Sequence, residues 1–344
     1  MILLTLNFVS AHNGGHDGCF QGGCPPGHSF GNPDPDLACP WTDPPCSSNP
    51  SSGCDVTFSS TLNPAMYYGI IDVCAGGISL SCNGASAVLI KMESVGGNTI
   101  TQCSGSIKLK NSNSNTLLTN VGYIELKQSN LNILDTNRAS ILLNISNDNT
   151  LINNNATGYT TSSGIQLINS NNNDIMNNIA NGNQVGIGIG LSNYNTVQNN
   201  VVNQNRAHGF FITSSSQNVL TGNTVTQNSF NTSIGYGNAG IVFVYSSDNN
   251  ALSSNTVNSN NGYGIYVIGS SLNNIQSNIV NSNNCGVGLY GYSFPANSNT
   301  VSGNTMNSNN ICGVYLSNSH FNTISSNMIA LTQSGVGISF GLSS

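Results

Sequence analysis

The chain has 344 residues, of which only 5% are Asp, Glu, Lys or Arg, whereas an average globular protein has about 25%. A net charge of −6 with six basic residues excludes the electropositive surface that nucleic acid or an anionic membrane requires. No apolar stretch approaches the roughly 20 residues of a membrane-spanning helix, so we expect no membrane span.

The first residues read as an export signal followed by a disulfide-held segment. Residues 1–11 are apolar and end in small residues, which resembles the end of a secretory signal. Residues 12–55 are rich in Cys, Pro and Gly, and eight of the ten cysteines lie between Cys19 and Cys103. We therefore expect an extracellular protein, secreted or on the cell surface, whose N-terminal segment depends on disulfides. Eight cysteines allow 105 pairings, so no pairing is predicted there.

Three N-terminal histidines have the side chains of metal ligands. The spacing of His12, His16 and His28 matches no standard zinc motif, and cysteines of an exported chain favour disulfides over metal. We predict no metal site and no cofactor, and these histidines are the candidates if a metal binds.

Residues 98–344 repeat one pattern. The motif N-x-[ILV]-x-x-N recurs ten times, in steps of 17 to 32 residues, and an imperfect copy begins at Asn98. We expect the first asparagines of successive units to form a buried ladder in which each amide bonds to the next, and we expect Asn there because it tolerates a left-handed turn. The clearest members of this ladder are Asn173, Asn195, Asn218, Asn250, Asn273, Asn299 and Asn322.

Each unit also contains a short strand of the form G-[IV]-x-[LIVF], such as Gly264-Ile265-Tyr266-Val267. Its alternation has the period of a strand, and a unit of about 22 residues buries its apolar face only by stacking on its neighbours. The sequence therefore predicts an all-β parallel β-helix, a solenoid of about ten to twelve coils. Residues 56–97 are expected to form a cap or the first coils.

These repeats resemble those of the NosD-like and pectin-lyase-like superfamily of right-handed parallel β-helix proteins. The resemblance covers residues 98–344 and implies the fold, while members of the superfamily include polysaccharide lyases, hydrolases, epimerases, phage tailspikes and non-catalytic surface proteins.

A catalytic role is not favoured by the residues. The polygalacturonase set N-T-D, D-D, H-G and R-x-K is represented only by His208-Gly209. Arg206 and His208 are the weak catalytic candidates, and Ca²⁺ would be needed only under a lyase mechanism.

A surface strip carries the stronger functional signal. Alignment of the strands places Phe211, Val242, Tyr266 and Tyr315 in one outward column, and Val244, Ile268 and Tyr290 in the next. Three interpretations stay open: a surface covered by residues 209–240 or the Cys-rich segment, a homo-oligomer interface, and a platform on which sugars stack. For the last, the ligand-binding candidates are Phe211, Tyr266, Tyr290 and Tyr315.

Two cysteines directly precede the strand glycine in successive units. Stacking places the Cα atoms of Cys285 and Cys312 about 4.8 Å apart, within disulfide range, so we predict that bond.

Lys108 and Glu125 occupy equivalent positions in neighbouring units and are expected to form a surface ion pair.

The leading hypothesis is a non-catalytic scaffold that binds or presents to carbohydrate-rich surfaces. The alternative is a polysaccharide lyase or glycoside hydrolase. An ice-binding or self-assembling surface protein ranks lower, because the outward column that contains Thr99, Thr116 and Thr150 is interrupted by Asp174 and other residues.

Overall fold

The computed structural model describes residues 54–229, 237–330 and 335–341. The chain divides into two units, Met1–Leu37 and Ala38–Ser344, and the architecture given below is that of the second. The predicted signal segment, and all but Cys54 and Asp55 of the Cys/Pro-rich segment, lie outside the described residues.

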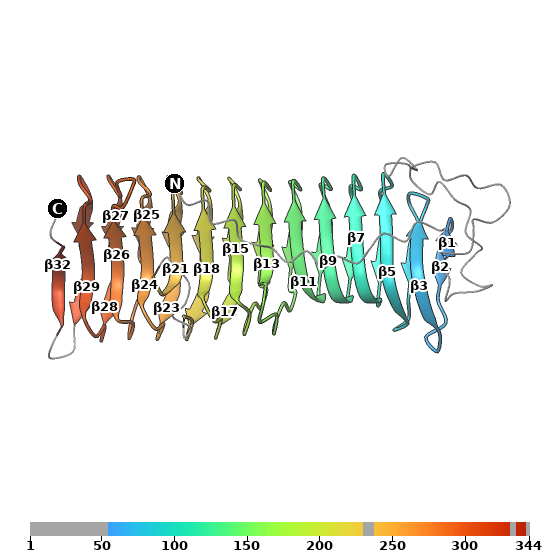
Figure 1. Ribbon diagram of the computed structural model, residues 1–344, viewed down its shortest axis with the longest axis horizontal. Coiled ribbons are helices and arrows are strands. Elements are labelled where there is room, and N and C mark those ends of the chain that lie inside the picture. The colour runs from blue at the N-terminus through green and yellow to red at the C-terminus, as the bar shows by residue number, and fades with distance from the viewer. Residues whose placement is uncertain (1–53, 230–236, 331–334, 342–344) are drawn as a thin grey trace, which may run out of the picture. The chain divides into compact units, whose positions relative to one another are not determined.

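The largest sheet runs along the whole solenoid. It has fourteen strands in consecutive order, all parallel, and Figure 1 shows them as a row of arrows pointing the same way. We call it the first sheet. Its strands are β1 (Cys54–Val56), β3 (Tyr67–Val73), β5 (Ser86–Glu93), β7 (Ser104–Lys110), β9 (Val121–Lys127), β11 (Arg138–Asn144), β13 (Ser163–Ile168), β15 (Val185–Gly190), β18 (His208–Thr213), β21 (Ala239–Val244), β24 (Tyr263–Ile268), β26 (Cys285–Tyr290), β29 (Cys312–Ser317) and β32 (Val336–Phe340).

A second sheet of thirteen short strands forms another side of each coil. Its strands are β2 (Ser60–Thr61), β4 (Ser79–Ser81), β6 (Thr99–Thr101), β8 (Thr116–Leu118), β10 (Ile133–Asp135), β12 (Thr150–Ile152), β14 (Asp174–Met176), β16 (Thr196–Gln198), β19 (Val219–Thr221), β22 (Ala251–Ser253), β25 (Asn274–Gln276), β27 (Thr300–Ser302) and β30 (Thr323–Ser325). The right-handed parallel β-helix predicted from the sequence is thus confirmed, and within the described ranges no segment is helical.

A third side appears only from the middle of the chain onward. Its strands are β17 (Val201–Asn203), β20 (Thr224–Thr226), β23 (Thr256–Asn258), β28 (Thr305–Asn307) and β31 (Met328–Ala330), and isolated bridges such as Asn155 to Ile179 extend it. From Asn98 to Asn149 the coils repeat every 17 residues, whereas Asn173 and Asn195 are 22 residues apart. Most of the added length is a third side, and the step from Asn218 to Asn250 contains an insertion as well.

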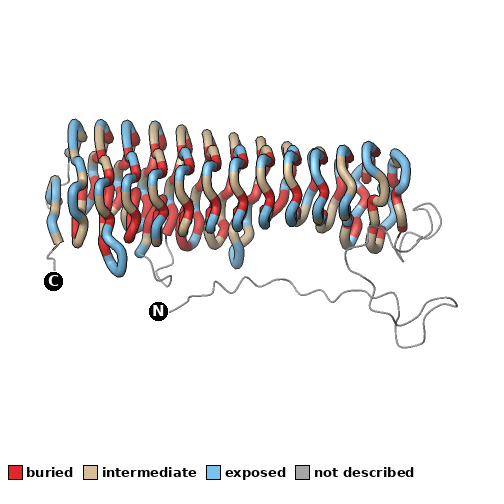
Figure 2. Tube along the Cα trace, turned by 90° about the horizontal axis from the view of Figure 1, so that it is seen from above, coloured by how far each residue is buried: buried red, intermediate tan, exposed pale blue. Residues whose placement is uncertain are grey.

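One apolar core fills the solenoid from end to end. The strands of the second sheet from β4 to β27 each contribute one inward residue, such as Leu117, Leu151 or Val197, with no exposed surface. Buried positions therefore recur at the same place in coil after coil, which Figure 2 shows as red segments along the inner side of the tube. The first strands continue both sheets in register, so residues 54–97 form coils and the described solenoid has more coils than the ten to twelve predicted.

The asparagine ladder is present in the predicted register. The backbone N–H and the side-chain Nδ2 of Asn195 both donate to Oδ1 of Asn218, at 2.9 and 3.0 Å, and Asn173 bonds to Asn195 in the same way. A second ladder passes through Asn200, whose Nδ2 donates to the Ile175 carbonyl and to Oδ1 of Asn223. The amides of these two ladders thus have partners inside the protein, which removes the cost of burying them.

A third ladder of asparagines was not predicted. Asn183, Asn205 and Asn228 are linked by the same type of bond, for example from Asn183 N–H to Asn205 Oδ1 at 2.8 Å. Each lies five residues after a member of the second ladder, so the repeat N-x-x-x-x-N was a signal available in the sequence. This ladder lies where the chain turns out of the third side, and it occurs in the coils that have that side.

The left-handed turns are not at the ladder asparagines, contrary to our expectation. The residue before each one has positive φ instead, including Tyr194 (60°), Leu272 (62°) and Phe321 (57°). Bulky residues seldom adopt this conformation, which costs of order 1–2 kcal/mol each. The ladder bond explains their tolerance, because the following Asn N–H is held by the amide of the next coil.

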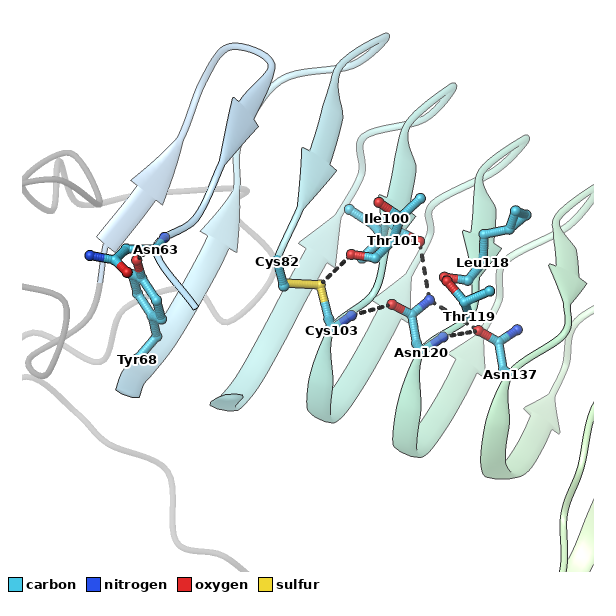
Figure 3. Close-up of a disulfide and its surroundings, with 10 residues drawn as sticks. All are labelled: Asn63, Tyr68, Cys82, Ile100, Thr101, Cys103, Leu118, Thr119, Asn120 and Asn137. Carbon is cyan, nitrogen blue, oxygen red and sulfur yellow. Dashed lines mark hydrogen bonds between the residues drawn. A yellow bond between two sulfur atoms is a disulfide. The ribbon is translucent and has the colours of Figure 1, made fainter. Parts of the chain in front are cut away.

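The disulfides Cys285–Cys312 and Cys82–Cys103 each join neighbouring coils. Cys285 and Cys312 are bonded with their Cα atoms 4.6 Å apart, as the sequence predicts. Cys82 and Cys103 form the other, and Figure 3 shows Cys103 at the end of the second ladder, with its N–H donating to Oδ1 of Asn120 at 3.0 Å. A disulfide therefore takes over from the asparagines at the point where the ladder ends.

Adjacent asparagines offer a test of the ladder. Asn273→Ala removes the acceptor for the N–H and Nδ2 of the buried Asn250, so we expect a loss of about 3 kcal/mol, from two unsatisfied buried donors. Urea unfolding followed by circular dichroism measures it. Asn274→Ala, at the exposed next position, is the control and should change stability by less than about 0.5 kcal/mol. Equal effects of the two variants would contradict the ladder's role.

Candidate functional site

The outer face of the first sheet collects most of the chain's chemically distinctive residues. Strand register places one outward column along it, which in chain order is Asp55, Asp72, Lys91, Lys108, Glu125, Leu142, Gln166, Gly188, Phe211, Val242, Tyr266, Gly288, Tyr315 and Ser339. The outer face around this column is charged on the strands from β3 to β11 and aromatic on the strands from β18 to β29. We call these two regions of the outer face the charged half and the aromatic half.

The charged half holds five of the six basic residues of the whole chain. They lie on β5, β7, β9 and β11, and are Lys91, Lys108, Lys110, Lys127 and Arg138. Three ion pairs connect this set to acids: Lys91 with Asp72 at 3.1 Å, Lys108 with Glu125 at 3.2 Å, and Lys110 with Glu93 at 2.7 Å. The Lys108–Glu125 pair is the one expected from the sequence.

These pairs explain little of the fold's stability. Partly exposed ion pairs contribute about 0–1 kcal/mol, and Lys110 stands directly opposite Lys127 in register, which is unfavourable for like charges. Tyr123 lies two residues before Glu125, and burial, followed by the charge of Glu125, raises the pKa of its phenol well above the usual range. The phenol of Tyr123 is therefore neutral at pH 7.

The aromatic half is a second hydrophobic cluster, outside the solenoid core. It consists of Ala239, Val242, Val244, Tyr266 and Ile268, with Phe211, Tyr245, Tyr263 and Tyr290 packed against it. The rings of Tyr263 and Tyr266 stack with centroids 4.1 Å apart and planes 9° apart. Tyr315 lies 6.3 Å from Tyr263, and Tyr290 lies 6.4 Å from Tyr266. Four tyrosines from three adjacent strands thus form one group.

A glycine makes room for the stacked pair. A Cβ on Gly288 would lie 2.6 Å from Cε1 of Tyr263 and 2.8 Å from Cδ2 of Tyr266. Burial, and then the neighbouring phenols of Tyr315 and Tyr290, raise the pKa of Tyr263 to about 12. Burial, and then the phenols of Tyr263, Tyr290 and Tyr315, raise the pKa of Tyr266 well above its usual range. The phenols stay neutral and can both donate and accept hydrogen bonds.

The four predicted ligand-binding residues differ in access. Tyr266 is only 9% exposed. A Cβ on Gly237, which belongs to the segment 209–240, would lie 3.1 Å from the Tyr266 ring, so Gly237 packs against this ring. Tyr266 is therefore covered, as one of the three interpretations held, and offers no free ring face. Phe211, Tyr290 and Tyr315 are each partly exposed.

Four further aromatic residues belong to this area and were not among the candidates: Tyr245, Tyr263, Tyr292 and Phe294. Tyr292 and Phe294 are exposed, and Tyr292 lies 6.3 Å from Tyr290. Tyr263 precedes the strand glycine, the position that His208 and Cys285 occupy in other coils. That shared position was the sequence signal for Tyr263, whereas Tyr292 and Phe294 lie in a turn whose path the sequence did not reveal.

The catalytic candidates do not form a catalytic group. His208 is buried, with 1% of its surface exposed, and neither ring nitrogen has a hydrogen-bond partner among the described residues. Its ring stacks on Phe211 at 5.6 Å, and burial lowers its pKa to about 4, against a smaller opposing effect of the Ala239 backbone. Arg206 is exposed. A buried neutral histidine has no access to a substrate, so His208 acts as a packing residue beneath the aromatic half.

No group of three or more His, Cys, Asp or Glu side chains within the described ranges could hold a metal ion. The described cysteines carry no free thiol. His12, His16 and His28 lie outside the described residues, so that candidate set stays a prediction.

Comparison with known proteins supplies the family. The model of the family described as "Periplasmic copper-binding protein (NosD)" matches residues 92–238 and 231–344. The chain belongs to the NosD family. The match spans the repeats identified from the sequence, and no curated protein matches the chain.

Solved structures share the fold of this NosD-family chain at low identity. A double mutant of the periplasmic alginate epimerase AlgG is 15% identical, with a TM-score of 0.55, over 86% of this chain and 82% of that one. The A-module of mannuronan C-5 epimerase AlgE4 from Azotobacter vinelandii is 12% identical, with a TM-score of 0.45, over 85% and 89% of the two chains. At these identities the likeness concerns the fold alone.

The cellular location follows from covalent chemistry and family. Disulfides persist in oxidising compartments, and the NosD description is that of a periplasmic protein, which together indicate a periplasmic or extracellular location. Across the described ranges, no helix has the length and apolar character needed to cross a membrane.

The buried histidine predicts a pH dependence of stability. Because the pKa of His208 falls from 6.5 to about 4 on folding, the unfolded chain binds a proton that the native one does not. Stability is therefore complete above pH 6.5 and falls as the pH drops toward 4, by about 3 kcal/mol. His208→Leu should remove this part of the loss, measured by urea unfolding at pH 7 and pH 4. The exposed His320→Leu is the control, and identical profiles of wild type and His208→Leu would refute the assignment.

Proposed function

We propose that this NosD-family chain is an exported, non-catalytic scaffold that binds glycan chains on the outer face of its first sheet. The observation that carries the proposal is the aromatic half, where Phe211, Tyr290 and Tyr315 present partly exposed rings beside a packed tyrosine cluster. Such a contiguous aromatic surface is typical of a site that binds a ligand or partner.

The chemistry of the patch suits sugars. A pyranose ring has apolar C–H faces and a polar rim of hydroxyls, and tyrosine combines an apolar ring with a phenol that donates and accepts hydrogen bonds. The stacked Tyr263 and Tyr266 hold the surrounding rings in place, which limits the side-chain entropy lost on binding. Extended β strands also give a flat surface that matches a linear polymer.

Fold relatives support a carbohydrate ligand by analogy. AlgG and AlgE4 are named as epimerases of alginate or mannuronan, and another solved structure with this fold is described as a surface protein and adhesin of Streptococcus pneumoniae, PfbA, at 13% identity with a TM-score of 0.37, over 83% of this chain and 91% of that one. Shared fold does not transfer activity, so the proposal depends on the surface of this chain.

Copper binding, which the family description names, has no support in the described residues. Copper sites in proteins use His, Cys thiolate and Met side chains. The described cysteines are oxidised, and no His, Cys, Asp or Glu cluster is present within the described ranges. Of the described methionines, Met92 and Met306 are buried in the core, whereas Met66, Met176 and Met328 lie on coils far apart along the solenoid. We therefore derive no step that involves copper.

Removing the accessible rings tests the proposal. The double variant Tyr290→Ala, Tyr315→Ala should weaken retention in polysaccharide-containing native gels at least tenfold, because both rings contribute stacking surface. The panel comprises glucan, mannan, xylan and alginate. Tyr194→Ala, an exposed tyrosine on a turn away from this face, is the control and should bind as the wild type does. Failure of the wild type to bind any member of the panel would eliminate the proposal.

An enzyme is the second candidate, and one observation favours it. Lys108, Glu125 and Tyr123 lie together on adjacent strands of the charged half, and such side chains are able to transfer protons. Burial and the charge of Glu125, however, raise the pKa of the Tyr123 phenol well above its usual range, and Glu125 is paired with Lys108.

Incubation with polysaccharides separates scaffold from enzyme. We expect neither unsaturated nor reducing ends to form from alginate or polygalacturonate, with or without Ca²⁺, because the Tyr123 phenol stays protonated and Glu125 is paired with Lys108. New ends that disappear in Glu125→Gln but persist in Asp174→Asn, an exposed acid on the second sheet, would replace the scaffold by an enzyme.

The lower alternative, ice binding, is weakened by the register of the second sheet. The outward column of the second sheet is interrupted not only by Asp174, Val219, Ala251 and Asn274 but also by Ile133, which stands between Thr116 and Thr150. An unbroken threonine array is therefore missing from this face.

A further inference from the structure

The third side of the coils presents two unbroken rows of side chains on its outer surface. Strand pairing and isolated bridges hold the coils of this side in one continuous register. The first row is β-branched at every position, and its members are all at least partly exposed: Ile179, Val201, Thr224, Thr256, Ile279 and Thr305. We call it the β-branched row.

A second row lies two residues further along each strand and is entirely polar. We call it the polar row, and it consists of Asn181, Asn203, Thr226, Asn258, Asn281 and Asn307.

Hydrogen bonds between coils hold the polar row in place. The N–H of Asn203 donates to Oδ1 of Asn181 at 2.7 Å, and Thr226 donates through N–H and Oγ1 to Oδ1 of Asn203, at 3.0 and 2.8 Å. The N–H of Asn307 donates to Oδ1 of Asn281 at 2.7 Å in the same way. Because these bonds use the side-chain oxygen, the amide nitrogens can still donate to water.

The fold does not require this composition. The equivalent outward position of the second sheet accepts Asp174, Ala251 and Asn274 among its threonines. At the corner before the second sheet, Asp248 accepts the same type of bond between coils, from the N–H of Ser271 at 2.6 Å. A strand and an inter-coil bond of this solenoid therefore both tolerate a charged residue, whereas neither row of the third side contains one.

Charge is almost absent from this part of the chain. Between Ile179 and Asn307, the only Asp, Glu, Lys or Arg residues are Arg206 and Asp248, and neither stands in the two rows. A charged group binds its own shell of water and orients the molecules around itself. A face without charges leaves the water above it free to form hydrogen bonds within its own layer.

The two rows together suit a layer of ordered water. Methyl groups form no hydrogen bonds, so water above the β-branched row bonds to other water, while the amides and hydroxyls beside it bind individual molecules. β-Branched side chains have few rotamers, so the surface is rigid. Its repeat along the solenoid is about 4.8 Å, close to the shorter repeat of the hexagonal ice lattice, and six coils extend it over about 24 Å.

We propose that the third side is an ice-binding face, on which the β-branched row and the polar row hold water in the arrangement of the crystal surface. The ligand is thus ice itself. This activity uses a different face from the proposed glycan site on the first sheet and does not depend on it.

A charge placed on the face tests the proposal. Thr224→Lys and Thr256→Lys should each lower thermal hysteresis about tenfold at equal protein concentration, because a strongly hydrated ammonium group interrupts the array. Nanolitre osmometry measures the hysteresis, and an ice recrystallisation assay provides a second readout. Thr196→Lys, on β16 of the second sheet between Asp174 and Val219, is the control and should act as the wild type does.

Several outcomes would overturn the ice-binding face. Wild type with neither thermal hysteresis nor inhibition of ice recrystallisation does so, and a dimer that dissociates in Thr256→Lys would then identify a second copy as the occupant. Equal activity of the wild type and both third-side variants also does so, as does an equal loss in Thr196→Lys.

A milder variant covers the case in which a lysine variant does not fold. Thr256→Ser removes one methyl group, keeps the hydroxyl and should still lower hysteresis about twofold, so undiminished hysteresis there contradicts the proposal. Binding to the polysaccharide panel should be unchanged in Thr256→Ser, so the ice-binding and glycan-binding proposals are tested separately.

Discussion

The asparagine-to-asparagine hydrogen bond between successive coils is the interaction on which the rest of the structure depends. Each ladder residue presents one oxygen to two donors of the coil before it, so a shift by even one residue would leave buried amides without partners. Hydrophobic stacking alone would tolerate such slippage, because Ile, Val and Leu are nearly interchangeable along the core. The ladders therefore give the solenoid its register, and the apolar column provides most of its stability.

The register of the coils in turn determines which side chains lie next to one another on the outer face. Because equivalent residues of successive coils lie one strand spacing apart, changes in side-chain type along the sequence become changes along a face. The first sheet passes from paired lysines and carboxylates to a cluster of tyrosines. The partly exposed ion pairs contribute little to the stability of the fold, and they lie on the face that carries the aromatic half. A long polymer that follows the solenoid axis would meet these zones in order.

The corner chemistry explains why coils of different length share one solenoid. Coils of 17 residues have two strands, and longer coils add a third strand with an additional asparagine five residues after the second. The new side is inserted at a corner, so the two long sheets continue without interruption. Disulfides add covalent links between coils. Cys82–Cys103 lies at the end of the second ladder, and Cys285–Cys312 lies beside the tyrosine cluster.

The sequence by itself determined the fold, the ladder register and the Cys285–Cys312 bond, because a solenoid turns a fixed repeat directly into contacts between neighbouring coils. The same alignment correctly placed Tyr266 and Tyr315 in one column. Only the tertiary structure decided that Tyr266 is covered and that His208 is buried against Phe211. These facts depend on how Gly237 and the rings of several strands pack over the sheet, and side-chain packing between irregular segments leaves no periodic trace in a sequence.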